Sequence, residues 1–356
     1  MRKVNICMVV QEPLVRGGIA AVVNGYRTSK LEEAFNIYYI ESYKDGGKLS
    51  KLCKVILGYF HFMFILMFYK PSVVHIHSSF GPSFYRKIPF IYFAHFKKIP
   101  IINHIHGADF ETFYTKASQK KKKLIRKIYN KCSKLIALSD EWKDNLMKIV
   151  PEKSIIIIHN YSHPHYDVVI NRDTRELNYQ VLFLGEIGKR KGCYDIPNVV
   201  EKVSKIIPKV KFVLAGSGDI QQLKRILEDK GMSKYVEFPG WVRGTGKDKL
   251  LRESDIFFLP SYNEGMPMSI LDAMGYGLPI VSTNVGGIPK IVVNGKNGYT
   301  CEPGDTDCFA NYMIELLLCR EKLRDFSNGS YEIVEENYSL DLHIKSLEKL
   351  YLTYIC

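Results

Sequence analysis

The sequence predicts an α/β fold with doubly wound parallel sheets, divided into two domains. Short apolar runs rich in β-branched residues alternate with longer helical stretches, and strands covered on both faces have this continuously apolar pattern. A chain of 356 residues is also long enough for two domains that each bury a core. The expected strands are Val4–Val10, Val73–His77, Ile101–Ile105, Leu135–Leu138, Ile155–His159, Val181–Leu184, Phe212–Ala215, Ile256–Leu259 and Pro279–Ser282.

The domain boundary is expected near residue 170. Between Asn160 and Gln180 the chain is polar, contains a proline and has no helical period, after which a new apolar run begins. This places one domain at residues 1–170 and the second at residues 171–339. A last helix within residues 340–356, roughly Leu340–Tyr354, has no strand after it, and we expect it to pack back on the first domain.

Composition favours a folded protein in a reducing compartment. Hydrophobic residues make up 46% of the chain and charged residues 24%, which excludes a disordered or fibrous protein. The eight cysteines are scattered, without a Cys-x-x-Cys pair, and are interpreted as buried thiols. The first residues lead directly into an apolar run without a signal-peptide cleavage site. These features predict a cytoplasmic protein.

Positive charge is concentrated in the first half of the chain. Residues 1–170 hold 26 Lys and Arg against 12 Asp and Glu, whereas residues 171–356 hold 24 against 25, which together give the net charge of +13. The first half is therefore expected to face an anionic membrane surface, a phosphorylated acceptor or a nucleic acid. Nucleic acid is the least favoured of these partners, because no recognised binding motif accompanies the charge.

Two segments of the first half bear on membrane contact. Val55–Tyr69 is almost wholly apolar, but its 15 residues fall short of the ~20 that cross a bilayer. It is either a buried helix between strands or a helix lying partly in the membrane interface. The run Lys120–Lys123, continued by Arg126, Lys127, Lys131 and Lys134, predicts a helix with a basic face, either solvated or in contact with anionic headgroups.

Glycine-rich turns follow several expected strands and indicate a phosphorylated ligand. Gly17 and Gly18 follow the first strand, Gly185 leads into Arg190, Lys191 and Gly192, and Gly216 follows a later strand. At the carboxyl ends of parallel strands, glycines let backbone amides approach a phosphate and helix N-termini supply positive potential.

Two carboxylates stand at the most specific stretch, residues 260–279. Glu264 lies in the loop after Ile256–Leu259, Pro267 suits the first turn of a helix, and Asp272 lies early on that helix. Both side chains can face a ligand at the helix N-terminus. Alternatively, Asp272 only complements the helix dipole and Glu264 is a solvated loop charge.

These motifs resemble the retaining nucleotide-sugar glycosyltransferases of family 4, which have the GT-B fold of two Rossmann-like domains facing an interdomain cleft. The stretch from Glu264 to Asp272 is similar to the family's Glu-x7-Glu motif, with Asp as the second acid. Further similar segments occur in the family's order along nearly the whole chain: Gly17-Gly18, Val74–His77, His104–Phe110, Gly185 to Gly192, Phe238–Val242 and Asn284–Pro289.

The resemblance implies roles for individual residues. Lys191, Glu264 and His106 would be catalytic: Lys191 neutralises the donor diphosphate, Glu264 holds sugar hydroxyls, and His106 lies beside the anomeric carbon. Asp272 would bind the ribose, and Gly17 and Gly18 would let the opposite domain close on the donor. The other implied donor-binding residues are Arg190, Gly216, Trp241, Val242, Gly265, Met266 and Met268. The chain departs from the family at Glu186, where Arg is usual; Arg190 could supply that charge.

The implied reaction is transfer of a hexosyl or N-acetylhexosaminyl group from a nucleotide-sugar, most often UDP-linked in the family, to a saccharide acceptor in cell-surface polysaccharide synthesis. A saccharide carried on a polyprenyl diphosphate would suit the basic first half, and a teichoic or protein acceptor stays open. The transfer would proceed with retention, without metal or other cofactor, on the inner face of the plasma membrane. Two alternatives stay open. His75 and His77, and His104 and His106, share strand faces and so suggest a metal hydrolase; the basic first half suggests a non-catalytic membrane-binding module.

Overall fold

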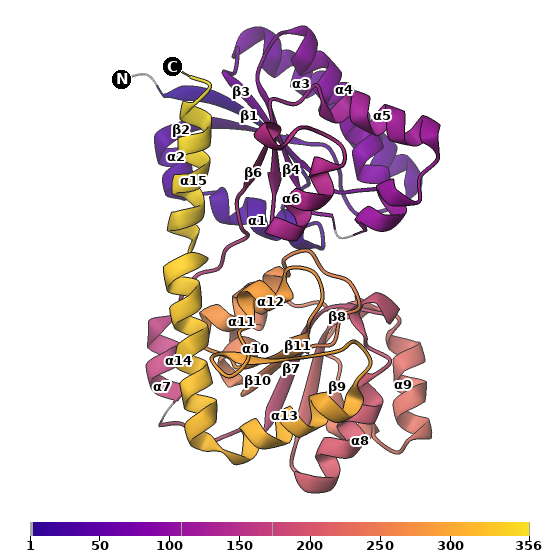
Figure 1. Ribbon diagram of the computed structural model, residues 1–356, viewed down its shortest axis with the longest axis vertical. Coiled ribbons are helices and arrows are strands. Elements are labelled where there is room, and N and C mark those ends of the chain that lie inside the picture. Colours follow the sequence, from indigo (N-terminus) through magenta and orange to yellow (C-terminus); the bar gives the residue numbers. More distant parts are fainter. Residues whose placement is uncertain (1–2, 108, 173, 356) are drawn as a thin grey trace. The chain divides into compact units, whose positions relative to one another are not determined.

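The computed structural model describes residues 3–107, 109–172 and 174–355, which form two compact units (Figure 1). Unit 1 comprises Met1–Asn160 and Leu340–Cys356, and unit 2 comprises Tyr161–Ser339. The chain thus changes unit after Asn160, ten residues before the boundary that the polar stretch suggested, because that stretch begins with a segment already belonging to unit 2. The final helix, α15 (Leu340–Leu352), belongs to unit 1.

Unit 1 contains a parallel sheet with the strand order β2-β1-β3-β4-β5-β6. Its strands are β1 (Val4–Val10), β2 (Phe35–Glu41), β3 (Val73–Ser78), β4 (Ile101–Ile105), β5 (Lys134–Ala137) and β6 (Ile155–Ile157). Its helices, besides α15, are α1 (Gly18–Tyr26), α2 (Lys30–Ala34), α3 (Lys48–Phe68), α4 (Pro82–Phe96), η1 (Glu111–Thr115), α5 (Gln119–Tyr129), α6 (Asp140–Met147) and η2 (Glu152–Ser154). The chain runs toward β2 first and then back across β1, so the right-handed crossovers cover both faces of the sheet.

Unit 2 contains a second parallel sheet, with the order β12-β11-β10-β7-β8-β9. Its strands are β7 (Gln180–Ile187), β8 (Lys211–Gly218), β9 (Val236–Glu237), β10 (Ile256–Leu259), β11 (Ile280–Thr283) and β12 (Gly298–Cys301). Its helices are α7 (Tyr166–Arg172), η3 (Lys189–Lys191), α8 (Ile196–Ile206), α9 (Ile220–Asp229), η4 (Ser233–Tyr235), α10 (Thr245–Glu253), α11 (Met268–Gly275), α12 (Ile288–Ile291), α13 (Thr306–Leu318) and α14 (Arg320–Asn337).

The doubly wound α/β fold predicted from the apolar runs is confirmed in both units. The central strands β3 and β10 are buried along their whole length. In each sheet the order of the strands reverses beside the strand that comes first in the chain. This point lies at β1 in unit 1 and at β7 in unit 2. In open α/β sheets, ligands bind at the carboxyl ends of the strands near such a point.

Helix α3 differs from its sequence-based description. The helix runs from Lys48 to Phe68, and it is the one helix among the described residues long and apolar enough to cross a membrane by length and composition. The segment Val55–Tyr69 alone is too short to cross a bilayer, but the helix begins seven residues before Val55. The interpretation as a buried helix is wrong for most of its length, since only Val55, Gly58, Phe62, Ile65 and Leu66 are buried.

The cysteines also differ from the expectation of buried thiols. Cys301 and Cys308 form a disulfide, with their Cα atoms 6.2 Å apart. Cys53 and Cys319 are free and exposed, and Cys356 lies outside the described residues. The thiols of Cys7, Cys132 and Cys193 are free and buried.

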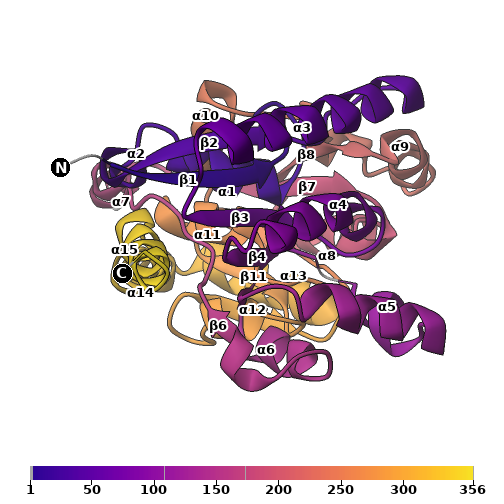
Figure 2. The same cartoon turned by 90° about the horizontal axis from the view of Figure 1, so that it is seen from above.

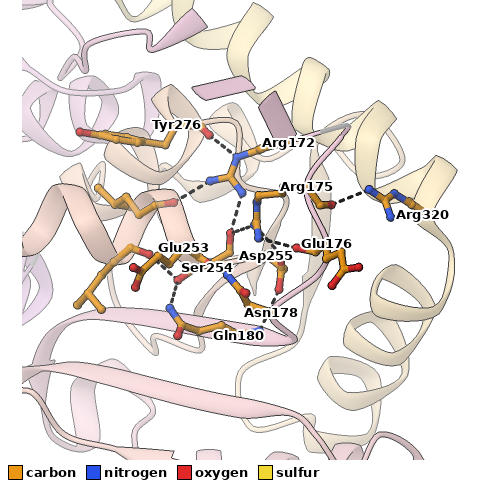
Figure 3. A network of polar contacts seen from close by, with 12 residues as sticks. Arg172, Arg175, Glu176, Asn178, Gln180, Glu253, Ser254, Asp255, Tyr276 and Arg320 are labelled. Carbon is orange, nitrogen blue, oxygen red and sulfur yellow. Dashed lines mark hydrogen bonds and ion pairs between the residues drawn. The ribbon is translucent and has the colours of Figure 1, made fainter. Parts of the chain in front are cut away.

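The guanidinium group of Arg172 connects α10 and α11 of unit 2 at the amino ends of the strands (Figure 3), and we call this contact the guanidinium clamp. Arg172 donates to the carbonyls of Leu251 and Ser254, at the C-terminus of α10, and to that of Tyr276, just after α11, each at 2.7 Å. Cations stabilise such helix ends. Burial lowers the pKa of Arg172 to about 9. Beside the clamp, Arg175 pairs with Asp255 at 2.6 Å.

A cavity of about 260 Å³ opens next to this clamp, lined by residues that include Arg172, Arg175, Asp255, Arg320 and Arg324. It lies at the amino ends of β7 and β10, where Gln180 and Asp255 precede or begin the strands. This is the end opposite to the ligand-binding end of an open α/β sheet. The arginines are accordingly interpreted as structural.

Candidate functional site

Two loops of unit 2 meet at the carboxyl ends of the neighbouring strands β7 and β10. Nζ of Lys191, in the η3 turn after β7, lies 2.5 Å from Oε1 of Glu264, in the loop after β10. The same oxygen accepts a hydrogen bond from Oγ of Ser261 at 2.7 Å. The Glu264 side chain is only 7% exposed. The sequence prediction that Lys191 and Glu264 belong to one site thus agrees with their contact in unit 2.

A close backbone approach makes the Lys191–Glu264 contact possible. The amide of Tyr262 donates to the carbonyl of Arg190 at 2.9 Å. Gly192 ends the η3 turn with φ +68°, and a Cβ atom there would lie 1.8 Å from the carbonyl oxygen of Pro260. Only glycine therefore fits this position without moving one of the loops.

The β10 loop is also fixed on its other side, by the segment after β11. Thr283 Oγ1 donates to the carbonyl of Ser261 at 2.7 Å, and the amide of Gly287 donates to the carbonyl of Gly265 at 2.7 Å. A Cβ atom on Gly286, which has φ +57°, would lie 1.9 Å from the carbonyl oxygen of Glu264. The Gly286-Gly287 pair therefore lets this segment lie directly against the Glu264 backbone.

Arg190 belongs to the same cluster. Its Nη1 donates to the carbonyl of Asn263 at 3.1 Å and lies 3.6 Å from Oε1 of Glu264, while its Nη2 lies 3.6 Å from Glu186. The Arg190 side chain is 46% exposed. The guanidinium is therefore held near the Glu264 carboxylate while its side chain stays exposed, and Glu186 offsets part of its charge.

Asp272 lies on α11 and has two partners that the sequence did not reveal. Its Oδ2 pairs with Nζ of Lys247, on α10, at 2.5 Å, and its Oδ1 accepts from Oγ of Ser162 at 3.4 Å. The carboxylate is 18% exposed. A partly buried carboxylate fixed by a cation and a hydroxyl is well oriented to accept hydrogen bonds from a ligand.

The N-terminus of α11, which lies between Glu264 and Asp272 in the sequence, supplies backbone donors. Pro267 is the N-cap and no side chain caps the helix. The amide of Ile270 donates to the carbonyl of Pro267 at 3.2 Å, whereas no acceptor is found among the described residues for the amides of Met268 and Ser269. Met266 is buried, and Met268 is half-buried at the start of the helix. Such a helix end favours a negatively charged group.

The remaining implied donor residues of unit 2 lie on other loops. Gly216 is a buried residue of β8, and a Cβ atom there would lie 1.8 Å from the carbonyl oxygen of Gly185. Trp241 and Val242 are half-buried on the loop between β9 and α10.

The implied residues of unit 1 lie at the carboxyl ends of its own strands. Gly17, with φ +131°, is the N-cap of α1, and Gly18 is its first residue. His106 follows β4, and its amide donates to the carbonyl of Ser78 at 2.8 Å. Ala108, in the motif that contains His106, lies outside the described residues.

His106 is part of a histidine stack in unit 1. Its Nε2 lies within hydrogen-bond distance of Nδ1 of His77, at 2.9 Å, and its ring stacks on that of His104. His75 bonds the Tyr351 hydroxyl, and His343 bonds the Tyr26 hydroxyl. Burial lowers the pKa of His75 and His106 to about 3 and that of His343 to about 4, and those of His77 and His104 also lie well below the usual range.

Three of these residues come close enough to suggest a metal site. One ligand atom from each of His75, His77 and His104 lies within 4.8 Å of the others, and all three side chains are buried. A metal must lie in the plane of each imidazole that it binds. The rings of His75 and His104 are instead stacked, with their planes 9° apart, and those of His75 and His77 are 29° apart. In this arrangement the nitrogen lone pairs do not converge.

The site in unit 2 can hold a ligand that combines phosphate with hydroxyl groups. Lys191, Arg190 and the α11 N-terminus supply positive potential, and Glu264 and Asp272 supply hydroxyl acceptors. Ser261, Lys247 and Ser162 were not predicted as site residues from the sequence. Ser261 could have been found as a hydroxyl directly after a strand, but Lys247 and Ser162 have no local signal.

Comparison with known proteins agrees with this geometry. Residues 171–333 match the family model described as glycosyl transferases group 1, and residues 18–161 match that of glycosyltransferase family 4. The chain is 26% identical over 310 residues to the UDP-Gal:α-D-GlcNAc-diphosphoundecaprenol α-1,3-galactosyltransferase of Escherichia coli, covering 82% of this chain and 78% of that one. It is 27% identical over 265 residues to the N-acetyl-α-D-glucosaminyl L-malate synthase of Bacillus anthracis, covering 72% and 68%.

Solved structures share the fold at low sequence identity. Sucrose-phosphate synthase from Thermosynechococcus elongatus matches with a TM-score of 0.78 at 14% identity over 99% of each chain. HepE of Anabaena in complex with UDP-glucose matches with a TM-score of 0.73 at 16% identity over 98% of this chain and 99% of that one. With its two parallel six-stranded sheets and family matches over both halves, the chain belongs to the group 1 glycosyl transferases of family 4, which have the two-domain α/β GT-B fold.

Proposed function

We propose that this glycosyltransferase transfers a hexosyl or N-acetylhexosaminyl group from a UDP-sugar to a saccharide acceptor linked to a polyprenyl diphosphate, in cell-surface polysaccharide synthesis. The observation that carries the proposal is the contact of Lys191 with Glu264 beside the α11 N-terminus. A cation, a helix end and a hydroxyl acceptor together match the diphosphate and sugar of such a donor. The Escherichia coli relative is named for UDP-Gal and a diphosphoundecaprenol-linked acceptor.

The proposed chemistry depends on stabilising the leaving group. Cleavage of the sugar–phosphate bond places negative charge on the diphosphate, and fixed cations at that point stabilise the transition state most. Lys191 has this role in the proposal, Arg190 supports it, and Glu264 orients the sugar hydroxyls. His106 is the third catalytic residue of the proposal, and it is a neutral imidazole near neutral pH because burial lowers its pKa to about 3.

We propose that the sugar keeps its anomeric configuration and that no metal takes part. A retaining double displacement needs a free carboxylate nucleophile. Oε1 of Glu264 is already engaged by Lys191 and Ser261, and Asp272 is engaged by Lys247. This favours attack of the acceptor from the leaving-group face, with the departing phosphate accepting the acceptor's proton. The cations of the chain replace a metal ion at the diphosphate.

A panel of UDP-hexoses and UDP-N-acetylhexosamines tests the proposal. Thermal unfolding with each compound identifies the donor, since a ligand at 100 times its dissociation constant stabilises the folded protein by ~2.7 kcal/mol. Transfer to a polyprenyl-diphosphate saccharide is then measured with and without excess chelator, and the product's anomeric configuration is determined by NMR. Transfer that persists in chelator excludes the metal hydrolase, and any transfer excludes a mere binding module.

The proposed place of action is the cytoplasmic side of the plasma membrane, with the protein bound peripherally. The uneven charge supports this, since residues 1–170 carry 26 Lys and Arg against 12 Asp and Glu. Fractionation of cells tests the location, and release from the membrane by high salt or alkaline carbonate distinguishes a peripheral protein from one that spans the bilayer.

A further inference from the structure

Helix α3 of unit 1 has two apolar faces. Val55, Gly58, Phe62, Ile65 and Leu66 form the buried stripe, at helical spacing. The stripe packs closely, because a Cβ atom on Gly58 would lie 3.2 Å from the carbonyl oxygen of Glu41, at the end of β2. A helix of this kind normally carries polar residues on its other face.

The opposite face of α3 is apolar and exposed. Its large exposed residues are Leu49, Leu52, Ile56, Leu57, Phe60, Phe64, Met67 and Phe68. At 100° per residue they fall on one half of the helix surface, which is about 31 Å long for 21 residues. Phe60 is 72% exposed and Leu57 65% exposed. This is a continuous apolar strip rather than a scatter of single side chains.

Helix α4 extends the exposed apolar surface. It lies beside α3 (Figures 1 and 2), and its Phe90 ring contacts those of Tyr59 and Phe62 at 4.8 and 5.0 Å. Phe96, at its C-terminus, is 82% exposed. The other large exposed residues of α4 are Tyr85, Tyr92 and Phe93. We call the exposed apolar residues of α3 and α4 together the α3/α4 face.

The segment of the chain that contains the α3/α4 face carries only positive charge. Residues 46–108 contain eight Lys and Arg and no Asp or Glu. Two of these cations are engaged, since Lys54 pairs with Glu12 and Glu41, and Lys87 is buried. Lys48, Lys70, Lys97 and Lys98 are exposed at the ends of α3 and α4 and form no ion pair with any residue of the described ranges.

We propose that the α3/α4 face is a lipid-binding surface that lies in the plane of an anionic bilayer. Apolar and aromatic side chains would enter the boundary between headgroups and acyl chains, and the four lysines would contact anionic headgroups. The absence of carboxylates over 63 residues, 46–108, is what selects an anionic membrane over a protein partner, whose surface would present both signs of charge.

An in-plane position follows from the buried stripe of α3. A membrane-spanning α3 would have to leave β2 and α4 and would expose Phe62, Ile65 and Leu66 of the unit 1 core. Lying in the interface leaves these contacts intact. The basic helix α5 is secondary here, because Lys121 and Lys122 lie over the rings of Phe113 and Tyr114 at 5.3 and 5.7 Å.

Vesicle flotation tests the lipid-binding surface. The purified full chain is mixed with vesicles of phosphatidylcholine alone or with 30 mol% phosphatidylglycerol added, at about 0.1 M and 1 M salt. We expect binding to anionic vesicles, weak binding to neutral ones, and partial release at 1 M salt, where the Debye length falls to ~3 Å. The double variant Phe60→Glu/Phe64→Glu should bind anionic vesicles at least about tenfold more weakly than the unmodified chain. It removes two large apolar groups and adds two negative charges, which the anionic lipid repels.

A matched control uses exposed apolar residues of unit 2. Ile206 and Leu318 are 58% and 65% exposed, so Ile206→Glu/Leu318→Glu changes charge and apolar area similarly away from the α3/α4 face. This control should bind vesicles at least tenfold more tightly than the Phe60/Phe64 variant. Equal binding of the two variants would overturn the proposal, as would failure of the unmodified chain to float with anionic vesicles.

A protein partner or self-association is the competing explanation of the α3/α4 face. If Phe60→Glu/Phe64→Glu changed the sedimentation of the chain without changing vesicle binding, the face would be a protein interface and the proposal would be wrong. The inference is independent of the proposed transfer reaction, because flotation uses no sugar. Conversely, the Phe60/Phe64 variant should keep its turnover with a water-soluble acceptor.

Discussion

Nζ of Lys191 and Oε1 of Glu264 lie 2.5 Å apart, although 73 residues separate them in the chain. The side chains are 12% and 7% exposed, so each is the other's main neutralising partner. A donor that places a phosphate on Lys191 and a hydroxyl on Glu264 would engage both members of the pair at once.

Replacing Lys191 should reduce turnover. We expect Lys191→Ala to lower kcat by at least ~100-fold, the loss typical of removing one group that stabilises developing negative charge. Lys189→Ala is the matched control, because Lys189 is exposed in the same turn. Steady-state kinetics with the identified donor measure both, and circular dichroism checks folding. Near-normal turnover of Lys191→Ala would mean that the diphosphate is neutralised elsewhere.

The two carboxylates should affect different parts of the donor. Glu264→Gln should impair transfer far more than it weakens binding of the bare nucleoside diphosphate, because Glu264 would contact only the sugar. Asp272→Asn should weaken the bare nucleotide through lost ribose hydrogen bonds, by about 1 kcal/mol or more, which is a factor of about five. Calorimetric titration with UDP and kinetics with the UDP-sugar compare the two variants. Equal weakening of UDP by both would contradict this division.

The sequence predicted the central strands well and the edge strands poorly. All nine expected strands are present, within a few residues at their ends, whereas β2, β9 and β12 were not predicted. These three lie at the edges of the two sheets. An edge strand is covered less completely, and β2 is half-buried at five of its seven positions. Its sequence therefore lacks the continuous apolar run by which a central strand can be identified.

The site was predictable where residues follow strands and unpredictable where they come from separate helices. Lys191 and Glu264 come after β7 and β10, which neighbour each other in the sheet, so the topology alone brings their loops together. Lys247 reaches Asp272 from α10, and neither periodicity nor composition indicates that contact. The exposure of one apolar face of α3 was likewise not predictable, because an apolar sequence does not reveal which face of the helix is covered by the rest of the protein.

Two glycines with the same positive φ angle allow a direct test of the loop contact. Gly192 and Gly231 both have φ +68°, but only at Gly192 would a Cβ atom meet another loop, at 1.8 Å from the Pro260 carbonyl oxygen. Both alanine variants should lose stability of about 1–2 kcal/mol from the left-handed conformation. Only Gly192→Ala should also lose turnover, by about tenfold or more, because the Lys191 turn must shift. Chemical denaturation and kinetics on both variants measure this, and equal turnover would contradict it.

The histidine stack should make unit 1 less stable as the pH falls. An unfolded histidine has a pKa near ~6.5, whereas burial holds the pKa of His75 and His106 at about 3 and that of His343 at about 4 in the folded chain. Between these values the unfolded chain binds more protons than the folded one, so the free energy of unfolding decreases as the pH is lowered from about 6.5 toward 4. Each such histidine contributes up to about 1.4 kcal/mol per pH unit. His104→Leu should reduce this dependence without losing a hydrogen bond, because neither ring nitrogen of His104 has a partner among the described residues. Urea denaturation at pH 8 and pH 5, followed by Trp142 fluorescence in a Trp241→Phe background, gives the change in the free energy of unfolding with pH for both proteins. An equal change in the two proteins would show that His104 is protonated equally in the folded and unfolded states.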